Sequence, residues 1–150
     1  DVTGVWGFFN GLITVIALRQ RYAGHAKQAL ITAAGFRQGD MKTYYVTVDE
    51  DIDPTNLNEV LWAMCTRVDP ATSIDILHDA WTADLDPRVS PARREAGDLT
   101  IGRMLINACR PFTWRDQFPK SNVFSSEERK IVETKWRDLL EKAAARKRSA

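Results

Sequence analysis

The sequence lacks the features of a membrane protein, a disulfide-rich secreted scaffold or a nucleic-acid-binding protein. It has only two cysteines, Cys65 and Cys109, with no CxxC pair, which favours small buried hydrophobes in a reducing compartment. No apolar run approaches the ~20 residues that span a bilayer. With 21 basic and 20 acidic residues, the net charge of +1 provides no global attraction to nucleic acid or anionic lipid. We therefore expect a cytoplasmic protein without a membrane span or a nucleic-acid partner.

The composition instead predicts a globular domain with a substantial core. Hydrophobic residues make up 44% of the 150 residues, and no internal repeat or low-complexity segment is visible. The chain opens at Asp1 without a methionine and shows no signal-peptide pattern. We expect it to be a piece of a longer protein, in which groups that complete any site lie on another segment.

Short apolar segments alternate with helix-forming segments over residues 1–124. The β-branched run LITVIAL (12–18) is typical of a strand covered on both faces. Residues 26–34 favour a helix stopped by Gly35, and residues 44–48 and 74–77 favour two more strands. This order predicts an α/β fold with a mostly parallel or mixed sheet flanked by helices in a three-layer sandwich.

Two further helices carry capping signals at their starts. Asn56 with Glu59 predicts a capped helix whose buried face is made by Leu57, Val60, Leu61, Met64 and Val68. After a charged, loop-like stretch at 81–98, Ser125 with Glu128 predicts a long C-terminal helix over 125–150. Its apolar stripe consists of Val132, Trp136, Leu139, Leu140 and Ala143. We expect this helix to be a subunit-interface element.

An acid-rich run follows the strand at 44–48 and raises the question of a metal site. Its carboxylates belong to Asp49, Glu50, Asp51 and Asp53. An EF-hand loop is excluded, because Pro54 and Val60 stand where that loop needs glycine and a bidentate glutamate. A Mg²⁺ site at the carboxyl end of a strand remains an alternative. The preferred interpretation is that the acids interact with the positive N-terminus of the following helix.

Four segments, in order, closely resemble the C-terminal domain of the UbiD family of decarboxylases. They are RQRYAGHAKQAL (19–30), VDEDIDPTNLNEVLWAMCTRVDP (48–70), WTADLDPR (81–88) and ACRPFTWRDQFP (108–119). The resemblance implies a non-oxidative, reversible carboxy-lyase acting on an aromatic, heteroaromatic or α,β-unsaturated acid through prenylated FMN. It also implies a flavin prenyltransferase for cofactor supply and a homodimer or homohexamer.

The catalytic Glu-Arg-Glu set, the divalent metal (Mn or Mg) and potassium belong, by this resemblance, to regions N-terminal to the matched part. No catalytic or metal-binding residue is therefore expected in this chain, and the piece alone should be inactive. An alternative is a non-catalytic α/β assembly module that docks a partner through Trp136 and its stripe.

The resemblance assigns binding roles to two short segments. Arg37 matches a basic position that reaches the flavin phosphate, which the guanidinium fork suits. Asp40 matches a pocket-lining position, and the substrate-pocket segment corresponds to Thr82, Ala83, Asp84 and Leu85. Where ferulic acid decarboxylase-like members carry a bulky aromatic and a proline, this chain has Ala83 and Asp84, which indicates a more polar or larger substrate. Direct roles for His25, Lys27 and His78 stay open.

Overall fold

The computed structural model describes residues 1–36, 41–120, 127–128, 130–137 and 139. The chain divides into two compact units, Asp1–Phe118 and Pro119–Ala150. Within the described part of the chain, no helix has both the length and the apolar character needed to cross a membrane.

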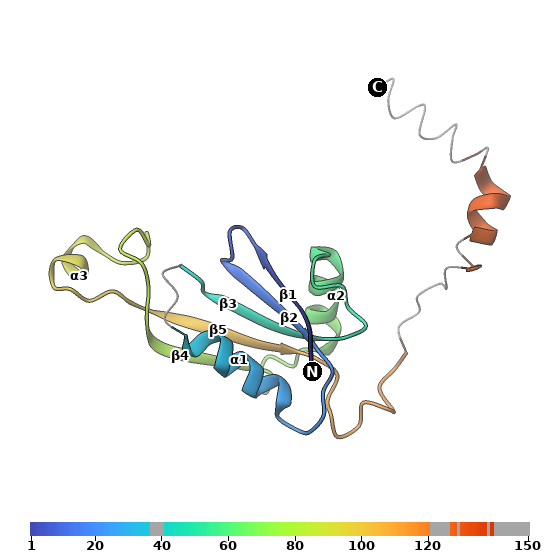
Figure 1. Ribbon diagram of the computed structural model, residues 1–150, viewed down its shortest axis with the longest axis horizontal. Helices are drawn as coiled ribbons and strands as arrows, with labels where there is room; N and C mark the ends of the chain where they lie inside the picture. The colour runs from blue at the N-terminus through green and yellow to red at the C-terminus, as the bar shows by residue number, and fades with distance from the viewer. Residues whose placement is uncertain (37–40, 121–126, 129, 138, 140–150) are drawn as a thin grey trace. The chain divides into compact units, whose positions relative to one another are not determined.

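A five-stranded mixed sheet forms the middle layer of the first unit (Figure 1). Its strands are β1 (Val2–Phe8), β2 (Ile13–Leu18), β3 (Tyr44–Asp49), β4 (Ile74–Trp81) and β5 (Thr100–Ala108), in the spatial order β1-β2-β3-β5-β4. The central strands β2, β3 and β5 are parallel, whereas β1 and β4 pair antiparallel at the two edges. The predicted α/β class is confirmed in its mixed form.

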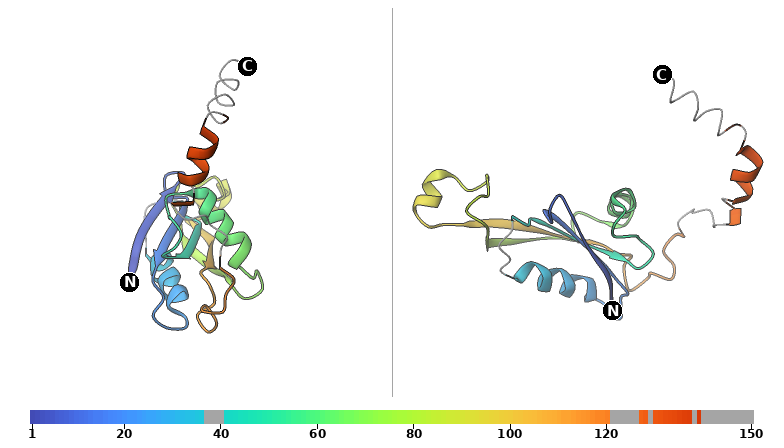
Figure 2. Two further views of the ribbon diagram at one scale, coloured as in Figure 1. Left: turned by 90° about the vertical axis from the view of Figure 1, so that its right-hand side faces the viewer. Right: turned by 45° about the horizontal axis from the view of Figure 1, so that its top comes forward.

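The helices cover opposite faces of this sheet. Helix α1 (His25–Gly35) packs on Ile16 and Leu18 of β2, and α2 (Leu57–Arg67) packs in the cluster that contains Val15 and Ala17. Because successive side chains of a strand point to opposite faces, β2 contributes to both cores, as its nearly unbroken apolar run predicts. Figures 1 and 2 show the two helices on the two sides of the sheet, which makes three layers.

One local prediction about these helices is wrong, and a second is right only in part. Gly35 is the last residue of α1 and does not follow it as a left-handed stop; Gly24 at the helix start has the positive φ, 92°. On α2 the predicted face is right for Val60, Met64 and Val68, which pack in one core cluster. It is wrong for Leu61, which is 47% exposed, and Cys65 is exposed as well. Ala63 and Arg67 are buried instead. Cys109 is buried as expected.

The sequence pattern did not predict strand β5. Its sequence TIGRMLINA interrupts the apolar positions with Gly102 and Arg103, which hides the strand period. The short helix α3 (Pro91–Glu95) likewise falls within the stretch expected to be a loop; Ser90 caps it by accepting a hydrogen bond from Arg93 N. The ribbon formed by β4 and β5 extends beyond the start of β3 and carries α3 at its tip (Figure 1).

In the second unit, residues 127–128, 130–137 and 139 are helical. The full length of the expected helix over 125–150 is not shown, because its other positions lie outside the described residues.

The three parallel strands define two ends of the sheet. At the carboxyl end, β2, β3 and β5 finish at Leu18, Asp49 and Ala108. At the amino end these strands begin, and both α1 and the antiparallel β4 arrive there with their last residues. The two ends have different polar chemistry.

Candidate functional site

The Asp49 carboxylate is the centre of a buried network at the carboxyl end. It accepts hydrogen bonds from Gln20 Nε2 at 2.9 Å, from Arg67 Nη1 at 3.0 Å, and from Arg110 Nε at 3.1 Å. The main-chain N of Arg110 donates a further hydrogen bond at 2.7 Å. Gln20 follows β2, Arg110 follows β5, and Arg67 ends α2, so one carboxylate joins both neighbouring strands to a helix.

The other two aspartates of the run have different partners. Arg67 binds both oxygens of Asp51, at 3.0 and 2.9 Å. Partial burial acts to raise the pKa of Asp51, but the hydrogen bond and charge of Arg67 leave that pKa below its usual value. Asp53 Oδ1 accepts from Thr55 N at 2.8 Å, and Glu59 Oε2 accepts from Asp53 N at 3.0 Å.

The Asp53 carboxylate binds Thr55, which precedes α2, so the interpretation of the acids as helix-start groups stays a prediction for Asp53; it is wrong for Asp49 and Asp51. Those two carboxylates bind the last turn of α2 instead, because Arg67 reaches back to them. Their oxygens are occupied by guanidinium donors, which is the chemistry of an ion-pair network and not of a magnesium cage. Within the residues that the structure describes, no group of three or more His, Cys, Asp or Glu side chains could hold a metal ion.

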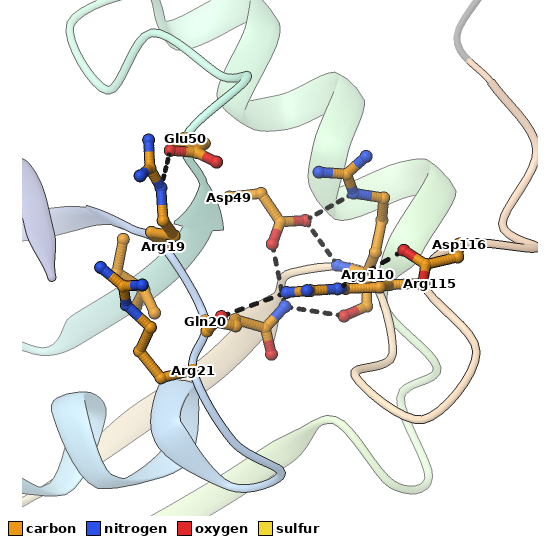
Figure 3. Close-up of a pocket in the computed structure, with 9 residues that line it drawn as sticks. Arg19, Gln20, Arg21, Asp49, Glu50, Arg110, Arg115 and Asp116 are labelled. Carbon is orange, nitrogen blue, oxygen red and sulfur yellow. Dashed lines mark hydrogen bonds and ion pairs between the residues drawn. The ribbon is translucent and has the colours of Figure 1, made fainter.

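A charged pocket of about 420 Å³ lies beside this network (Figure 3). Three of its four arginines pair with acids on its own walls, whereas Arg21 pairs with Asp1. Arg19 Nε lies 2.6 Å from Glu50 Oε2, and Arg115 Nε lies 3.7 Å from Asp116 Oδ1. Four arginines and three acids line the pocket, so most of its charge is neutralised within its own walls.

At the amino end, the loop after β4 is organised by Asp86. This carboxylate is fully buried and accepts from Thr82 Oγ1 at 2.6 Å. Arg88 donates to it from Nε at 2.8 Å, from Nη2 at 2.7 Å and from its main-chain N at 3.0 Å. The side-chain hydrogen bonds of Arg88, ahead of that of Thr82, lower the pKa of Asp86 to about 2. The loop is therefore closed around an ionised carboxylate.

The outer part of the same loop presents side chains to solvent from a fixed backbone. Leu85 is 83% exposed, and the Asp84 side chain is 74% exposed. Arg94 donates from Nε to Asp84 O at 2.8 Å and from Nη2 to Asp86 O at 2.6 Å. A large apolar side chain on a backbone pinned from both sides is a surface suited to contacting another molecule.

The predicted binding residues differ in how far they are exposed to solvent. Arg37 and Asp40 lie outside the described residues. Of the other four, Thr82 is fully buried, Ala83 is half-buried, and Asp84 and Leu85 are exposed. The residues before and after 37–40, Phe36 and Met41, lie at the amino end, where Arg103 Nη1 donates to Phe36 O at 3.2 Å and Arg88 Nη2 to Met41 O at 3.0 Å.

The three residues whose direct roles were left open lie apart from one another. His78 is exposed on β4 and lines a pocket of about 490 Å³ at the amino end. His25 begins α1 at the carboxyl end, where its Nδ1 accepts from Arg21 N at 3.2 Å. Lys27 pairs with Asp75 at 2.9 Å. Of the three, His78 alone lies next to the Thr82–Leu85 loop.

Three arginines that organise these ends were missed by sequence reasoning: Arg67, Arg88 and Arg103. For Arg103 a signal existed, since a charge within an otherwise apolar segment requires buried partners. For Arg88 the Asp-x-Arg spacing with Asp86 was a weaker signal. For Arg67 the local sequence offered none, because its partners lie 16 and 18 positions away.

Comparison with known proteins identifies relatives of this arrangement. The family model of the 3-octaprenyl-4-hydroxybenzoate carboxy-lyase C-terminal domain, UbiD_C, matches residues 1–108. A phenolic acid decarboxylase of Escherichia coli O157:H7 is 36% identical over 89 residues, which are 57% of this chain and 18% of the relative.

Solved structures show the same fold. The vanillic acid decarboxylase of Sedimentibacter hydroxybenzoicus in its closed form is 27% identical, with a TM-score of 0.70 over 93% of this chain and 29% of that one. The UbiD-class enzyme HmfF of Pelotomaculum thermopropionicum, in complex with FMN, is 25% identical, with a TM-score of 0.69 over 84% of this chain and 27% of that one. The chain thus spans less than a third of the length of each of these proteins.

Proposed function

Because the chain belongs to the UbiD family of carboxy-lyases, as a C-terminal domain, we propose that the full-length protein is a non-oxidative, reversible decarboxylase. Its substrate would be an aromatic, heteroaromatic or α,β-unsaturated carboxylic acid. The relatives that act on phenolic and vanillic acids support this class of substrate. Since the chain spans less than a third of their length, the activity belongs to the full-length protein and not to this piece.

The proposed cofactor is prenylated FMN, supplied by a flavin prenyltransferase. The FMN complex of HmfF supports a flavin cofactor. When bound, this group supplies an electron sink for the pair released as CO₂ leaves. By its match to the family's basic position, we assign the contact with the flavin phosphate to Arg37, while Arg88 and Arg103 donate to protein oxygens. We place the divalent metal (Mn or Mg), potassium and the Glu-Arg-Glu set in the part of the protein outside this chain.

This domain would contribute contacts to one side of the substrate. Asp40, Ala83, Asp84 and Leu85 would face it, and Thr82 would fix the loop from beneath through Asp86. The observation that carries this assignment is the 83% exposed Leu85 on a loop held by Arg88 and Arg94. A binding side chain on a fixed backbone loses little entropy when it contacts a substrate.

Assembly of the full-length protein would use the second unit. Its described residues expose the apolar side chains Ile131, Val132, Trp136 and Leu139. A row of exposed apolar groups on a helical segment suits burial against a second copy, in a homodimer or homohexamer. A pure partner-docking module remains the alternative, and it predicts that the full-length protein neither binds flavin nor releases CO₂.

The test uses the full-length protein matured with a flavin prenyltransferase. We expect flavin absorbance in the purified protein and CO₂ release from a panel of aryl and enoic acids. Arg37→Ala should reduce retained flavin by at least about tenfold, since one charge-assisted phosphate contact is lost. Arg21→Ala, at the exposed carboxyl end, is the matched control and should retain flavin normally. Equal retention in both variants would remove Arg37 from the cofactor site.

A further inference from the structure

Two arginines at the amino end each hold two separate loops. Arg103, on β5, donates from Nη1 to Phe36 O at 3.2 Å and from Nη2 to Trp81 O at 2.8 Å. It also donates from Nη1 to Ala34 O, which is a carbonyl in the last turn of α1. Arg88 donates from Nη2 to Met41 O at 3.0 Å and to the Asp86 carboxylate at 2.7 Å, and from Nη1 to Thr43 Oγ1.

These contacts bracket two segments symmetrically. Phe36 and Met41 flank residues 37–40, while Trp81 and Asp86 flank residues 82–85. Arg103 binds the residue that precedes each segment, and Arg88 binds the residue that follows each one. We propose that Arg88 and Arg103 are positioning residues, which fix the Thr82–Leu85 loop at both ends against the chain that flanks residues 37–40.

The energetics of Arg103 favour a role beyond simple packing. Its side chain reaches from β5 to the end of α1, the residue is 3% exposed, and its Nε has no hydrogen-bond partner. Among the residues that the structure describes, no carboxylate pairs with it; its guanidinium is held by carbonyl oxygens. A buried charge of this kind is costly, and an apolar side chain of similar volume is often as stable or more so. What the guanidinium adds is a rigid fork that sets the distance between two chain segments.

Arg88 supports the same conclusion from the opposite side. Neutralising the buried Asp86 requires only a positive charge, which a lysine could supply. Arg88 in addition reaches Met41 O and Thr43 Oγ1, so its fork joins the Asp86 loop to the chain entering β3. Thr43 Oγ1 donates in turn to Met41 O at 3.0 Å, which makes that short segment a defined anchor.

This role rests on the proposed function, because it acts through the residues proposed to contact substrate. Loss of a contact that is made equally in the ground state and the transition state raises KM and leaves kcat unchanged. We therefore expect Arg88→Ala in the full-length, cofactor-loaded protein to raise KM about tenfold with kcat changed less than about threefold. Arg88→Lys should restore thermal stability but not KM, since lysine keeps the charge and loses the fork.

The matched control for Arg88 is Arg93. Its side chain is 40% exposed against 42% for Arg88, and it also binds one carboxylate, that of Asp98, and one carbonyl, that of Thr100. It touches neither bracketed segment, so Arg93→Ala should leave KM unchanged. A merely structural loss would lower the folded fraction, and hence apparent kcat, in both variants alike.

A second measurement needs no substrate. Hydrogen exchange of the full-length protein should show faster exchange in both 41–45 and 81–86 for Arg88→Ala. For Arg103→Met, exchange should be faster in 34–36 and 81–86, and for Arg93→Ala in none of these segments. If Arg103→Met fails to fold, the Arg88 variants alone test the positioning role.

The outcomes separate this proposal from the proposed function. Faster exchange in both segments, together with a raised KM, supports positioning. Exchange that rises in 81–86 alone, or a KM fully restored by Arg88→Lys, overturns it. If the wild-type protein binds no flavin and releases no CO₂, the proposed function fails, while the exchange result still decides whether the two arginines couple the segments.

Discussion

The two ends of the parallel strands both rely on arginine, yet they use it differently. At the carboxyl end, Arg67 and Arg110 neutralise Asp49 and Asp51, and the donors come from a helix, the strand ends and their flanks. At the amino end, Arg103 donates to main-chain carbonyls of two separate segments, and Arg88 joins the Asp86 carboxylate to Met41 O. The first arrangement holds layers of the fold together, whereas the second fixes the course of loops.

This difference has a consequence for function. Ligands of open α/β sheets usually bind at the carboxyl ends of the strands. Here that end contains self-paired charges, and the outward-facing Leu85 lies on the loop at the opposite end. A fixed loop with exposed side chains is a better candidate for substrate contact than a saturated ion-pair network. The comparison can be tested by removing one group at a time and measuring stability and KM separately.

The largest loss of stability is expected for Arg67→Ala. The variant would leave Asp49, which is 5% exposed, and Asp51 with fewer donors, and removal of one partner of a buried ion pair costs about 3 kcal/mol. Thermal unfolding of the full-length protein measures this, and the KM of the remaining folded enzyme should be unchanged. Arg19→Ala is the control, because the Arg19–Glu50 pair is solvent-exposed and should contribute less than about 1 kcal/mol. A raised KM in Arg67→Ala would show that the carboxyl end acts on substrate.

A smaller, pH-dependent loss of folding stability is expected for Asp86→Asn at the amino end. Arg88 holds the folded-state pKa of Asp86 at about 2, against 3.8 in the unfolded chain. At ~1.4 kcal/mol per unit, ionised Asp86 contributes about 2 kcal/mol. Since the folded pKa is depressed, this stability is present above about pH 4 and is lost as the pH falls toward 2.

Unfolding of wild type and Asp86→Asn between pH 7 and pH 2 checks this expectation. The difference in stability should be constant near neutrality and shrink at acid pH. Asp98→Asn is the matched control: Arg93 likewise lowers the pKa of Asp98 to about 2, but the side chain is 43% exposed. Solvent screening should make its effect smaller and sensitive to salt. A difference for Asp86→Asn that persists unchanged at pH 2 would rule out the ionised carboxylate as its source.

Much of the fold could be predicted from the sequence, because it depends on local patterns. The apolar run at 12–18 requires burial on both faces, and Asn56 does cap α2 by accepting from Asn58 N. Strand β5, in contrast, was not predicted, because its sequence lacks a regular local pattern. Arg103 and Gly102 break the strand pattern, and the partners that hold Arg103 lie in distant elements, at the end of α1 and the end of β4. Long-range partners of this kind leave no periodic signal.

The same limit applies to the candidate site. The resemblance located the Thr82–Leu85 loop, but the burial of Thr82 and the exposure of Leu85 depend on Asp86 and Arg88. For the acid-rich run, the local sequence predicted a metal site or contacts with the start of a helix. The actual partner of Asp49 is Arg67, which lies 18 positions further along the chain.

The smallest effect on stability is expected for Leu85→Ala, and it separates the two ends most sharply. Because Leu85 is 83% exposed, the substitution removes almost no packing and should change stability by less than about 0.5 kcal/mol. If Leu85 contacts substrate, the lost apolar contact should still raise KM about tenfold. Leu61→Ala on α2, at 47% exposure, is the control for an exposed leucine remote from the loop, and should leave KM unchanged. Equal KM values for both variants would mean that Leu85, although exposed on a fixed loop, does not contact substrate.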